Sequence, residues 1–197
     1  MTSETITREF FERPPLVCAK EMLGCQLTWG DTAGIIVETE AYAEHGDEAS
    51  HAFFRPTTRT FIKDLPPGTL YIYLNYGVHW LLNFLTKGDD LRGFVLIRAL
   101  QPVAGVDLMR KRRRLEGEKM LCSGPGKLTQ ALGITAQWHG KDFFSVPGVR
   151  LTRNRKRPRL AIDRRIGITK SPEFEWRFFI ADSEYISFKK RKPAPDP

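Results

Sequence analysis

The spacing of apolar residues predicts one short helix near the start of the chain and a strand hairpin after it. Residues 1–14 show no sustained period, and we expect them to form an extended arm. Apolar side chains recur at helical spacing from Leu16 to Leu23, and Gly24 then supplies a stop signal. Residues 26–29 and 34–42 are rich in strand formers, and the Gly-containing stretch between them predicts a hairpin.

The second strand of this hairpin has an acidic face. Strict alternation places four side chains on one face, Ile36, Glu38, Glu40 and Tyr42, and the intervening residues on the other. Unpaired carboxylates are costly to bury in an apolar core. This face is therefore expected to be exposed to solvent or to form a functional site.

The next part of the chain reads as short elements separated by breaks. Residues 57–63 fit one helical turn. Residues 68–86 are strand-like and rich in aromatics, with a kink or bulge expected at Tyr76. Residues 93–100 form a further strand after a short turn.

Two helices are expected after this strand. The first opens at Pro102 and continues into the basic residues 110–114, and the second covers residues 128–132. Short strands are then expected over residues 176–180 and 185–188.

Repeated short strands with few helices between them predict a mixed α/β (α+β) fold. We expect a single domain with a curved antiparallel β-sheet flanked by helices, covering residues 1–188, and a basic, disordered tail at residues 189–197. No stretch approaches the ~20 apolar residues of a transmembrane helix, and the N-terminus has no signal-peptide pattern. A cytoplasmic protein without a membrane partner is expected.

The charge of the chain favours a polyanionic partner. Lys and Arg number 31 against 23 Asp and Glu, which gives a net charge of +8. Basic runs at residues 110–114, 150–159 and 189–192 favour nucleic acid first and a membrane surface second, although many soluble proteins are basic without such a partner. The three cysteines form no C-x-x-C pair, which argues against a disulfide framework and a cysteine zinc site.

An acidic segment interrupts this basic chain. Residues 35–51 contain no Lys or Arg but five carboxylates: Glu38, Glu40, Glu44, Asp47 and Glu48. Because such a cluster repels the polyanion that a basic surface attracts, one resolution is that a carboxylate does chemistry in a pocket. Glu40, beside Tyr42, would suit a general base that acts on water if it is partly buried among aromatic rings. A solvent-facing Glu40 with no chemical role is the alternative.

Tyrosines provide a second signal. Tyr71, Tyr73 and Tyr76 fall within one stretch, and tyrosine at these positions favours stacking surfaces with a wet edge over plain core. Stacking on an aromatic ring stabilises a bound base by ~1–3 kcal/mol. A carboxylate, aromatic rings and a positive surface together predict a pocket for an unstacked base.

Two other motifs are weaker. Glu48 and His51 have E-x-x-H spacing, and His45 could add a third ligand, but a di-iron site needs two such copies on long helices, so no metal is expected. Residues 124–127 (GPGK) lack the outer Gly and the Ser or Thr of a phosphate loop. We predict that Lys127, at a helix N-terminus, contacts a DNA phosphate. The alternative is that residues 124–127 only form an ordinary start of a helix. A metalloenzyme and a non-catalytic nucleic-acid-binding protein remain the alternative functions.

Five segments carry a resemblance to known proteins. They are VETEAY (37–42), DEASH (47–51), PGTLYIYLNYG (67–77), VLIRAL (95–100) and CSGPGKLTQALGI (122–134). In this order they resemble the mammalian-type alkyladenine (3-methyladenine) DNA glycosylase family. The resemblance implies a DNA repair enzyme that flips alkylated or deaminated purines out of duplex DNA and hydrolyses the N-glycosidic bond, leaving an abasic site. We expect a monomer that needs no cofactor and acts on double-stranded DNA containing damaged purines.

The resemblance assigns the chemistry to two residues. Glu40 matches the general base that activates water to attack C1′ of the flipped nucleotide. Arg98 matches the residue that helps to hold that water and a nearby phosphate. No lysine nucleophile is among the matched residues, so the implied enzyme is a monofunctional hydrolase without strand cleavage.

The other matched residues would contact the base. Tyr42 and Tyr73 match the aromatics that sandwich it, and His51 matches the residue that packs against it and hydrogen-bonds to it. Asn83 matches a position that disfavours the amino group of normal guanine, and Leu96 matches a pocket-lining residue.

Further matched positions concern the DNA. Tyr76 matches the side chain that fills the gap left by the flipped base. Where the family has a Gly-containing, Arg-rich loop, this chain has the shorter sequence AFFRPTTRTFIKDLP. Thr57 and Arg59 are the DNA contacts predicted within it, and Phe53 and Phe54 are expected to alter the depth of the pocket.

Overall fold

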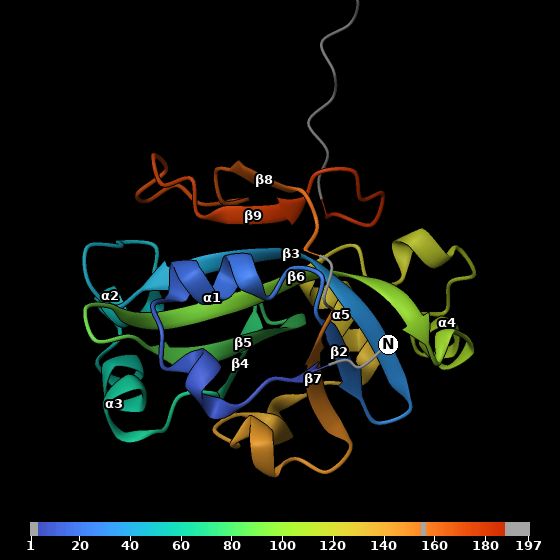
Figure 1. The fold of residues 1–197 in the computed structure, drawn as a ribbon, viewed down its shortest axis with the longest axis horizontal. Coiled ribbons are helices and arrows are strands. Elements are labelled where there is room, and N and C mark those ends of the chain that lie inside the picture. Colours follow the sequence, from blue (N-terminus) through green and yellow to red (C-terminus); the bar gives the residue numbers. More distant parts are fainter. Residues whose placement is uncertain (1–3, 155–156, 188–197) are drawn as a thin grey trace, which may run out of the picture.

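A curved antiparallel β-sheet forms the centre of the protein (Figure 1). The computed structural model describes residues 4–154 and 157–187. Within these ranges the sheet runs β1-β7-β2-β3-β6-β5-β4, with β9 paired to β3 and β8 to β9. The strands are β1 (Glu4–Thr5), β2 (Gln26–Trp29), β3 (Thr32–Ala43), β4 (Leu70–Asn75), β5 (His79–Lys87), β6 (Arg92–Ala104), β7 (Val149–Arg153), β8 (Leu160–Asp163) and β9 (Arg177–Ile180).

Short helices flank this sheet. The α-helices are α1 (Pro15–Glu21), α2 (His51–Phe54), α3 (Pro56–Asp64), α4 (Val106–Arg113) and α5 (Pro125–Leu132). Single 3₁₀ turns cover Arg8–Phe11, Glu118–Met120, Ala136–Trp138 and Phe143–Ser145. The predicted α+β fold with a curved antiparallel sheet is therefore confirmed. The division into a domain and a tail stays a prediction, and residues 189–197 lie outside the described ranges.

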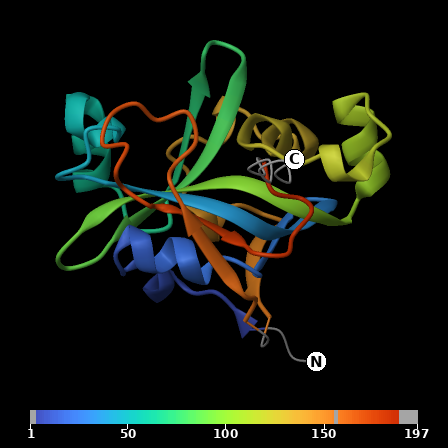
Figure 2. The same cartoon turned by 90° about the horizontal axis from the view of Figure 1, so that it is seen from above.

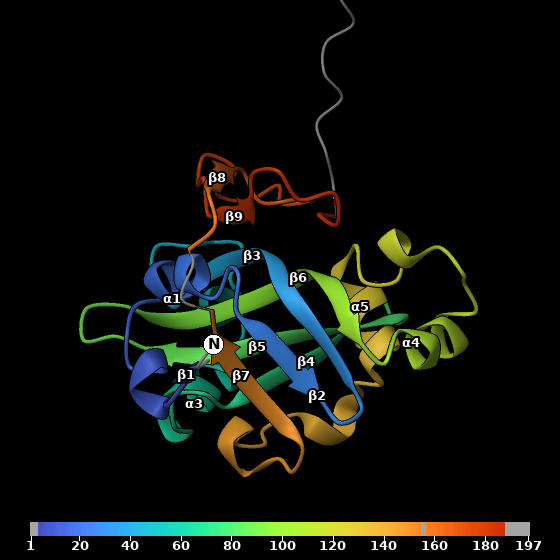
Figure 3. The same ribbon diagram turned by 45° about the vertical axis from the view of Figure 1, so that its right-hand side comes forward.

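Two parts of the sheet stand apart from its centre. Figure 2 shows the β4–β5 hairpin projecting beyond the other strands, with α2 and α3 on one side and α4 and α5 on the other. Figure 3 shows β8 and β9 as a separate pair that lies against β3. The loop between β8 and β9 can therefore reach the face of β3 that carries the acidic residues.

The predicted β2–β3 hairpin is confirmed. Trp29 pairs with Thr32, so the turn contains only Gly30 and Asp31, and Gly30 has φ of +54°. Glycine adopts this left-handed conformation without the steric cost of a side chain.

A β-bulge in β3 changes which residues share a face. Ile36 pairs with Leu100 and Glu38 with Ala99, so Val37 is an extra residue between them. Ile36 packs in the main core, whereas Val37 packs in a separate cluster with Ala99. The prediction that Ile36 lies on the acidic face is wrong, because the bulge shifts the alternation by one position. Beyond the bulge, Glu38 and Glu40 share a face as expected.

The N-terminal segment is part of the core. Phe11 is fully buried in the 3₁₀ turn, and its ring stacks on Phe84 of β5 with 5.3 Å between ring centres. Phe10 is buried beside it. The prediction of an extended arm over residues 1–14 is wrong, because these two rings are buried against the sheet and anchor the segment.

Three element boundaries also differ from the prediction. Tyr76 lies at the tip of a tight hairpin, since Asn75 pairs with His79, and is not a kink within one strand. Pro102 lies inside β6, where it pairs with Gly34, and α4 begins only at Val106. The expected last strand is absent over residues 185–187, and Phe188 lies outside the described ranges.

Candidate active site

Four neighbouring strands bring polar and aromatic side chains to one face of the sheet. Backbone pairing aligns Glu40 of β3 with Leu96 of β6, Leu96 with Asn83 of β5, and Asn83 with Tyr71 of β4. Side chains two positions along a strand share a face, which adds Tyr42, Tyr73, Leu81, Phe94 and Arg98. All of these residues except the fully buried Glu40 line a pocket of about 300 Å³, together with neighbouring segments.

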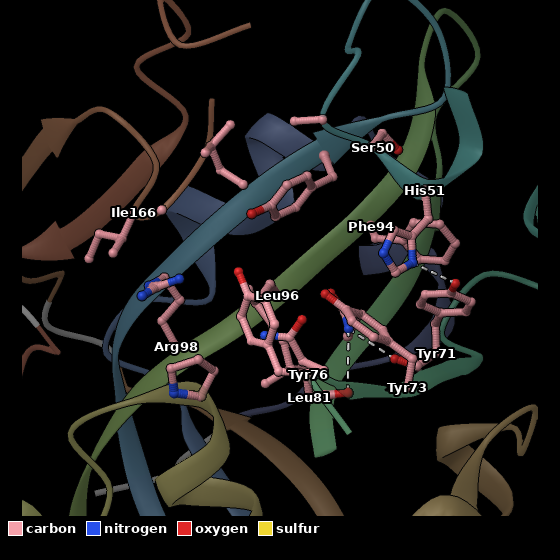
Figure 4. A pocket seen from close by; sticks show the side chains of 17 residues that line it. Ser50, His51, Tyr71, Tyr73, Tyr76, Leu81, Phe94, Leu96, Arg98 and Ile166 are labelled. Carbon is pink, nitrogen blue, oxygen red and sulfur yellow. Dashed lines mark hydrogen bonds between the residues drawn. The ribbon is translucent and has the colours of Figure 1, made fainter. Parts of the chain in front are cut away.

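The remaining walls come from segments outside the central strands. They are residues 49–51 at the start of α2, the hairpin tip with Tyr76, Pro125 at the start of α5, and residues 166–168 between β8 and β9. Figure 4 shows Ile166 and Arg98 at one end of the pocket, and His51 and Tyr73 at the other. The sheet supplies the floor, and four separate segments supply the rim.

Glu40 lies behind the end of the pocket that Arg98 and Ile166 form. It is fully buried, and three groups donate hydrogen bonds to it: the Tyr42 hydroxyl to Oε2 (2.7 Å), Arg98 Nη1 to Oε2 (3.2 Å), and the Ile166 backbone N–H to Oε1 (2.7 Å). All three donors belong to residues that line the pocket. The carboxylate itself has no exposed surface and does not line the pocket, so these three donors stand between it and a molecule in the pocket.

The donors to Glu40 keep their protons. Burial, followed by the neighbouring Glu40 carboxylate, raises the pKa of Tyr42 well above its ordinary value. Burial alone would lower the pKa of Arg98, but the carboxylates of Glu40 and Glu38 outweigh it and raise that pKa. At neutral pH the carboxylate is therefore surrounded by a phenol, a guanidinium and a backbone amide.

Glu38 holds Arg98 from the other side. Its carboxylate, also fully buried, accepts from Arg98 Nε (3.3 Å), Arg177 Nε (2.7 Å) and Ser187 Oγ (2.8 Å). Arg98 therefore bridges Glu38 and Glu40. The acidic face is buried and paired with arginines, which resolves the conflict between a carboxylate cluster and a basic protein.

The opposite wall of the pocket consists of aromatic rings. The rings of His51 and Tyr73 lie 4.4 Å apart, and His51 Nδ1 is 2.9 Å from the Tyr71 hydroxyl. Burial, with a smaller contribution from Arg55, lowers the pKa of His51 to about 4, so the imidazole is neutral at pH 7. Tyr42 stands on β3 and Tyr73 on β4, with two strands between them. The gap between the two walls can accept a planar group.

Asn83 and Leu96 form the floor between these walls. The Asn83 amide nitrogen donates to the Tyr71 carbonyl oxygen at 3.0 Å, which fixes the orientation of the side chain. The amide oxygen is then the polar group that Asn83 can present to a ligand. Leu96 is buried on the neighbouring strand.

Tyr76 is the most exposed large side chain at the pocket. It is 89% exposed at the tip of the β4–β5 hairpin and has φ of +50°. A non-glycine residue in this left-handed region is uncommon and occurs in tight turns. The turn thus holds an aromatic ring in solvent at the rim of the pocket.

None of the three predicted DNA contacts lines the pocket. Thr57 is exposed on α3. Arg59 is exposed but donates to the carbonyl oxygens of Ala52 and Phe53, so it also ties α3 to α2. Lys127 is half-buried and donates to Ser123 Oγ at 3.3 Å. Their roles in DNA binding stay predictions.

Phe53 and Phe54 do not line the pocket. Both are about half exposed on α2, and the ring of Phe54 meets the edge of His51 with 5.6 Å between ring centres. The expectation that they alter pocket depth is wrong, because α2 turns their side chains outward.

Three residues of the site carry no sequence signal of their own. Ile166, Arg165 and Arg177 come from the C-terminal part of the chain and meet β3 and its loop across more than a hundred residues. The excess of basic residues made ion pairs with the carboxylates of residues 35–51 possible. Nothing in the sequence indicated which arginine pairs with which carboxylate.

Across residues 4–154 and 157–187, no group of three His, Cys, Asp or Glu side chains could hold a metal ion. His45, Glu48 and His51 therefore do not come together as a ligand set. The three cysteines are free and buried. The helices within these ranges all lack the length and apolar character of a membrane-spanning segment.

Comparison with known proteins identifies related sequences. The family described as methylpurine-DNA glycosylase (MPG) matches residues 9–184. A Rhodopseudomonas palustris protein, named provisionally as a 3-methyladenine DNA glycosylase, is 43% identical over 96% of this chain and 89% of its own length. Proteins with the same provisional name from Nitrosospira multiformis (43% identical; 89% of this chain, 90% of the relative) and Chlorobium luteolum (41%; 91% and 95%) also match.

Proposed function

The chain belongs to the methylpurine-DNA glycosylase family, and from this we propose that it excises damaged purines from DNA as a monofunctional glycosylase. Its substrates are alkylated purines, such as 3-methyladenine, and deaminated purines in double-stranded DNA. The products are the free base and an abasic site. The protein acts as a monomer in the cytoplasm, where its DNA binding associates it with the nucleoid.

The observation that carries this proposal is the environment of Glu40. A fully buried carboxylate lies directly behind one end of an aromatic pocket and accepts hydrogen bonds from three residues that line it, Tyr42, Arg98 and Ile166. A pocket of about 300 Å³ is at the lower end of small-ligand sites and suits a single base with its sugar. The base must leave the helix to enter it, which is base flipping.

In the proposed reaction Glu40 acts as general base. A water between Glu40, Arg98 and the sugar gives its proton to the carboxylate, and its oxygen bonds to C1′. The C1′–N9 bond breaks, and its electron pair leaves with the base. A purine methylated at N3 or N7 is cationic and leaves readily as a neutral base, whereas a neutral purine such as hypoxanthine takes up a proton from solvent to become the free base. Among the described residues no lysine lines the pocket, which supports hydrolysis without a Schiff base.

The pocket walls select the base. Stacking between Tyr42 on one side and the His51–Tyr73 pair on the other binds a flat ring system, and electron-rich rings favour a cationic purine. Neutral His51 hydrogen-bonds to the edge of the base, and Asn83 disfavours the exocyclic amino group of guanine. Tyr76 enters the duplex and occupies the gap that the flipped nucleotide leaves.

The test measures release of free base from two kinds of DNA. Duplex oligonucleotides carrying hypoxanthine or etheno-adenine, and methylated DNA, are incubated with wild type, with Glu40→Gln, and with Glu116→Gln. The last is a matched control, because the Glu116 side chain is 95% exposed. We expect wild type and Glu116→Gln to release base, and Glu40→Gln to bind the DNA but release base ~10²–10⁴-fold more slowly.

Two results would count against the proposal. If Glu40→Gln released base at the wild-type rate, the carboxylate would not be the base. If wild type bound DNA but released nothing, the chain would be a non-catalytic DNA-binding member of the family.

A further inference from the structure

Arg165 is a buried cation directly behind one wall of the pocket. Its side chain is 1% exposed and donates two hydrogen bonds to Asp47, of 2.6 and 2.7 Å. Its Cζ lies 4.6 Å from the centre of the Tyr42 ring, over which it forms a cation–π contact. Tyr42 lines the pocket and Arg165 does not. The cation therefore covers the face of the ring that is turned away from a bound base.

The Arg165–Asp47 pair joins three segments of the pocket wall. Arg165 donates to the Ala41 carbonyl oxygen of β3 at 3.1 Å, next to Tyr42. Asp47 accepts from the backbone N–H of Ala49, the residue with which the α2 side of the pocket begins. Ile166, which follows Arg165 directly, donates its N–H to Glu40. Movement of the guanidinium would shift the stacking wall and a donor to the general base together.

Two more rings complete the surroundings of Arg165. Phe174 and Trp176 stack on each other at 4.2 Å, and their ring centres lie 5.9 and 5.3 Å from its Cζ. Both belong to the loop between β8 and β9, as Arg165 does. The loop therefore folds over its own arginine, and Asp47 is the charged group that binds this arginine from outside the loop.

We propose that Arg165 is a positioning and specificity-determining residue of the pocket, which acts through Tyr42 and Ile166 and whose charge is balanced by Asp47. The inference rests on the proposed glycosylase function. With Asp47 ionised, the pair is neutral as a whole, and a cationic purine stacks on Tyr42 without facing a net charge. Without the Asp47 charge, the guanidinium repels a cationic base through the ring but leaves a neutral base unaffected.

The specificity test compares Asp47→Asn with the double variant Asp47→Asn/Arg165→Gln. Single-turnover release is measured for 7-methylguanine, which is cationic, and for hypoxanthine, which is neutral. A unit charge about 8 Å from the base predicts that Asp47→Asn lowers 7-methylguanine release about tenfold more than hypoxanthine release. The double variant also removes the cation, so its ratio of the two rates should return to the wild-type value.

The positioning test uses Arg165→Lys. Lysine keeps the charge but has neither the paired donors nor the flat surface of a guanidinium. We expect its single-turnover rate to fall about tenfold for both bases, with unchanged affinity for duplex DNA. Asp142→Asn is the control, because it breaks the ion pair of Asp142 with Arg8, in which 2.7 Å separates the charged atoms. Neither residue lines the pocket. It should change neither the rate nor the ratio.

The outcomes separate this inference from the proposed function. Equal losses for both bases in Asp47→Asn, or no recovery in the double variant, would overturn the specificity role. A wild-type rate in Arg165→Lys would overturn the positioning role, and it decides the matter if Asp47→Asn does not fold. If wild type releases only 7-methylguanine, the inference stands or falls on the rate at which Arg165→Lys releases that base. If wild type releases neither base, the proposed function fails, and this inference fails with it.

Discussion

Glu38→Gln tests whether the buried ion network both stabilises the fold and holds Arg98. Glu38 is fully buried and is shared by Arg98 and Arg177, with 3.3 and 2.7 Å to its Oε1. Glutamine keeps the shape of the side chain but replaces the negative charge by an amide. Two buried guanidinium groups then lose their common anion. The amide NH₂ meets another donor whichever way it turns, either the guanidinium groups at the Oε1 position or the Ser187 N–H at the Oε2 position.

The expected loss in the free energy of unfolding follows from removing one partner of a buried ion pair. Removing one partner of a buried ion pair costs about 3–5 kcal/mol, because the remaining charge stays desolvated. Arg98 keeps Glu40 and Arg177 keeps Asp163, so we expect the lower end, about 3 kcal/mol. For a chain of this length, each kcal/mol lowers the melting temperature by roughly 2–4 °C, so the shift should be roughly 6–12 °C.

The assay is urea unfolding of wild type, Glu38→Gln and the surface control Glu116→Gln, followed by base release at a temperature where all are folded. The control should stay within about 0.5 kcal/mol of wild type. Base release by folded Glu38→Gln should fall about tenfold, because Arg98 loses one of its two carboxylate partners. A loss of stability below about 1 kcal/mol, or an unchanged rate, would refute the reasoning.

Three further predictions concern Tyr76 as the side chain that fills the gap in the duplex, the protonation of His51, and the effect of salt and a chelator. Tyr76→Ala, which removes an 89% exposed ring, should lower excision from duplex DNA about tenfold more than from single-stranded DNA; equal losses would contradict the wedge role. Burial lowers the pKa of His51 from its ordinary value of 6.5 to about 4 in the folded protein. Between pH 4 and pH 6.5 the unfolded chain therefore binds more protons than the folded protein does. The contribution of His51 to stability should therefore be present above pH 6.5 and be lost as the pH falls toward 4, and urea midpoints of wild type and His51→Gln should converge there. Affinity for DNA should fall steeply as the salt concentration rises, and an affinity that does not depend on salt would contradict the role of the basic surface. EDTA should leave base release unchanged, and inhibition by EDTA would favour the alternative of a metalloenzyme.

Local pattern predicted much of this fold. The β2–β3 hairpin and α1 follow from strand-forming residues, glycine turns and helical spacing, which act over a few residues. The errors occurred where distant contacts decide the outcome. Val37 is accommodated as a bulge because of the pairing of β3 with β6, and Phe11 is buried because a ring of β5 lies opposite it.

The sequence by itself determined that Glu40 and Tyr42 share a face, that aromatic residues gather in one stretch, and that the chain resembles a DNA glycosylase. These are properties of short segments and their order. Only the tertiary structure decided that three carboxylates of residues 35–51 are buried and that three arginines pair with them: Arg98 with Glu40, Arg165 with Asp47 and Arg177 with Glu38. The physical reason is that an ion pair depends on distance in space, and its partners here lie 58, 118 and 139 residues apart along the chain.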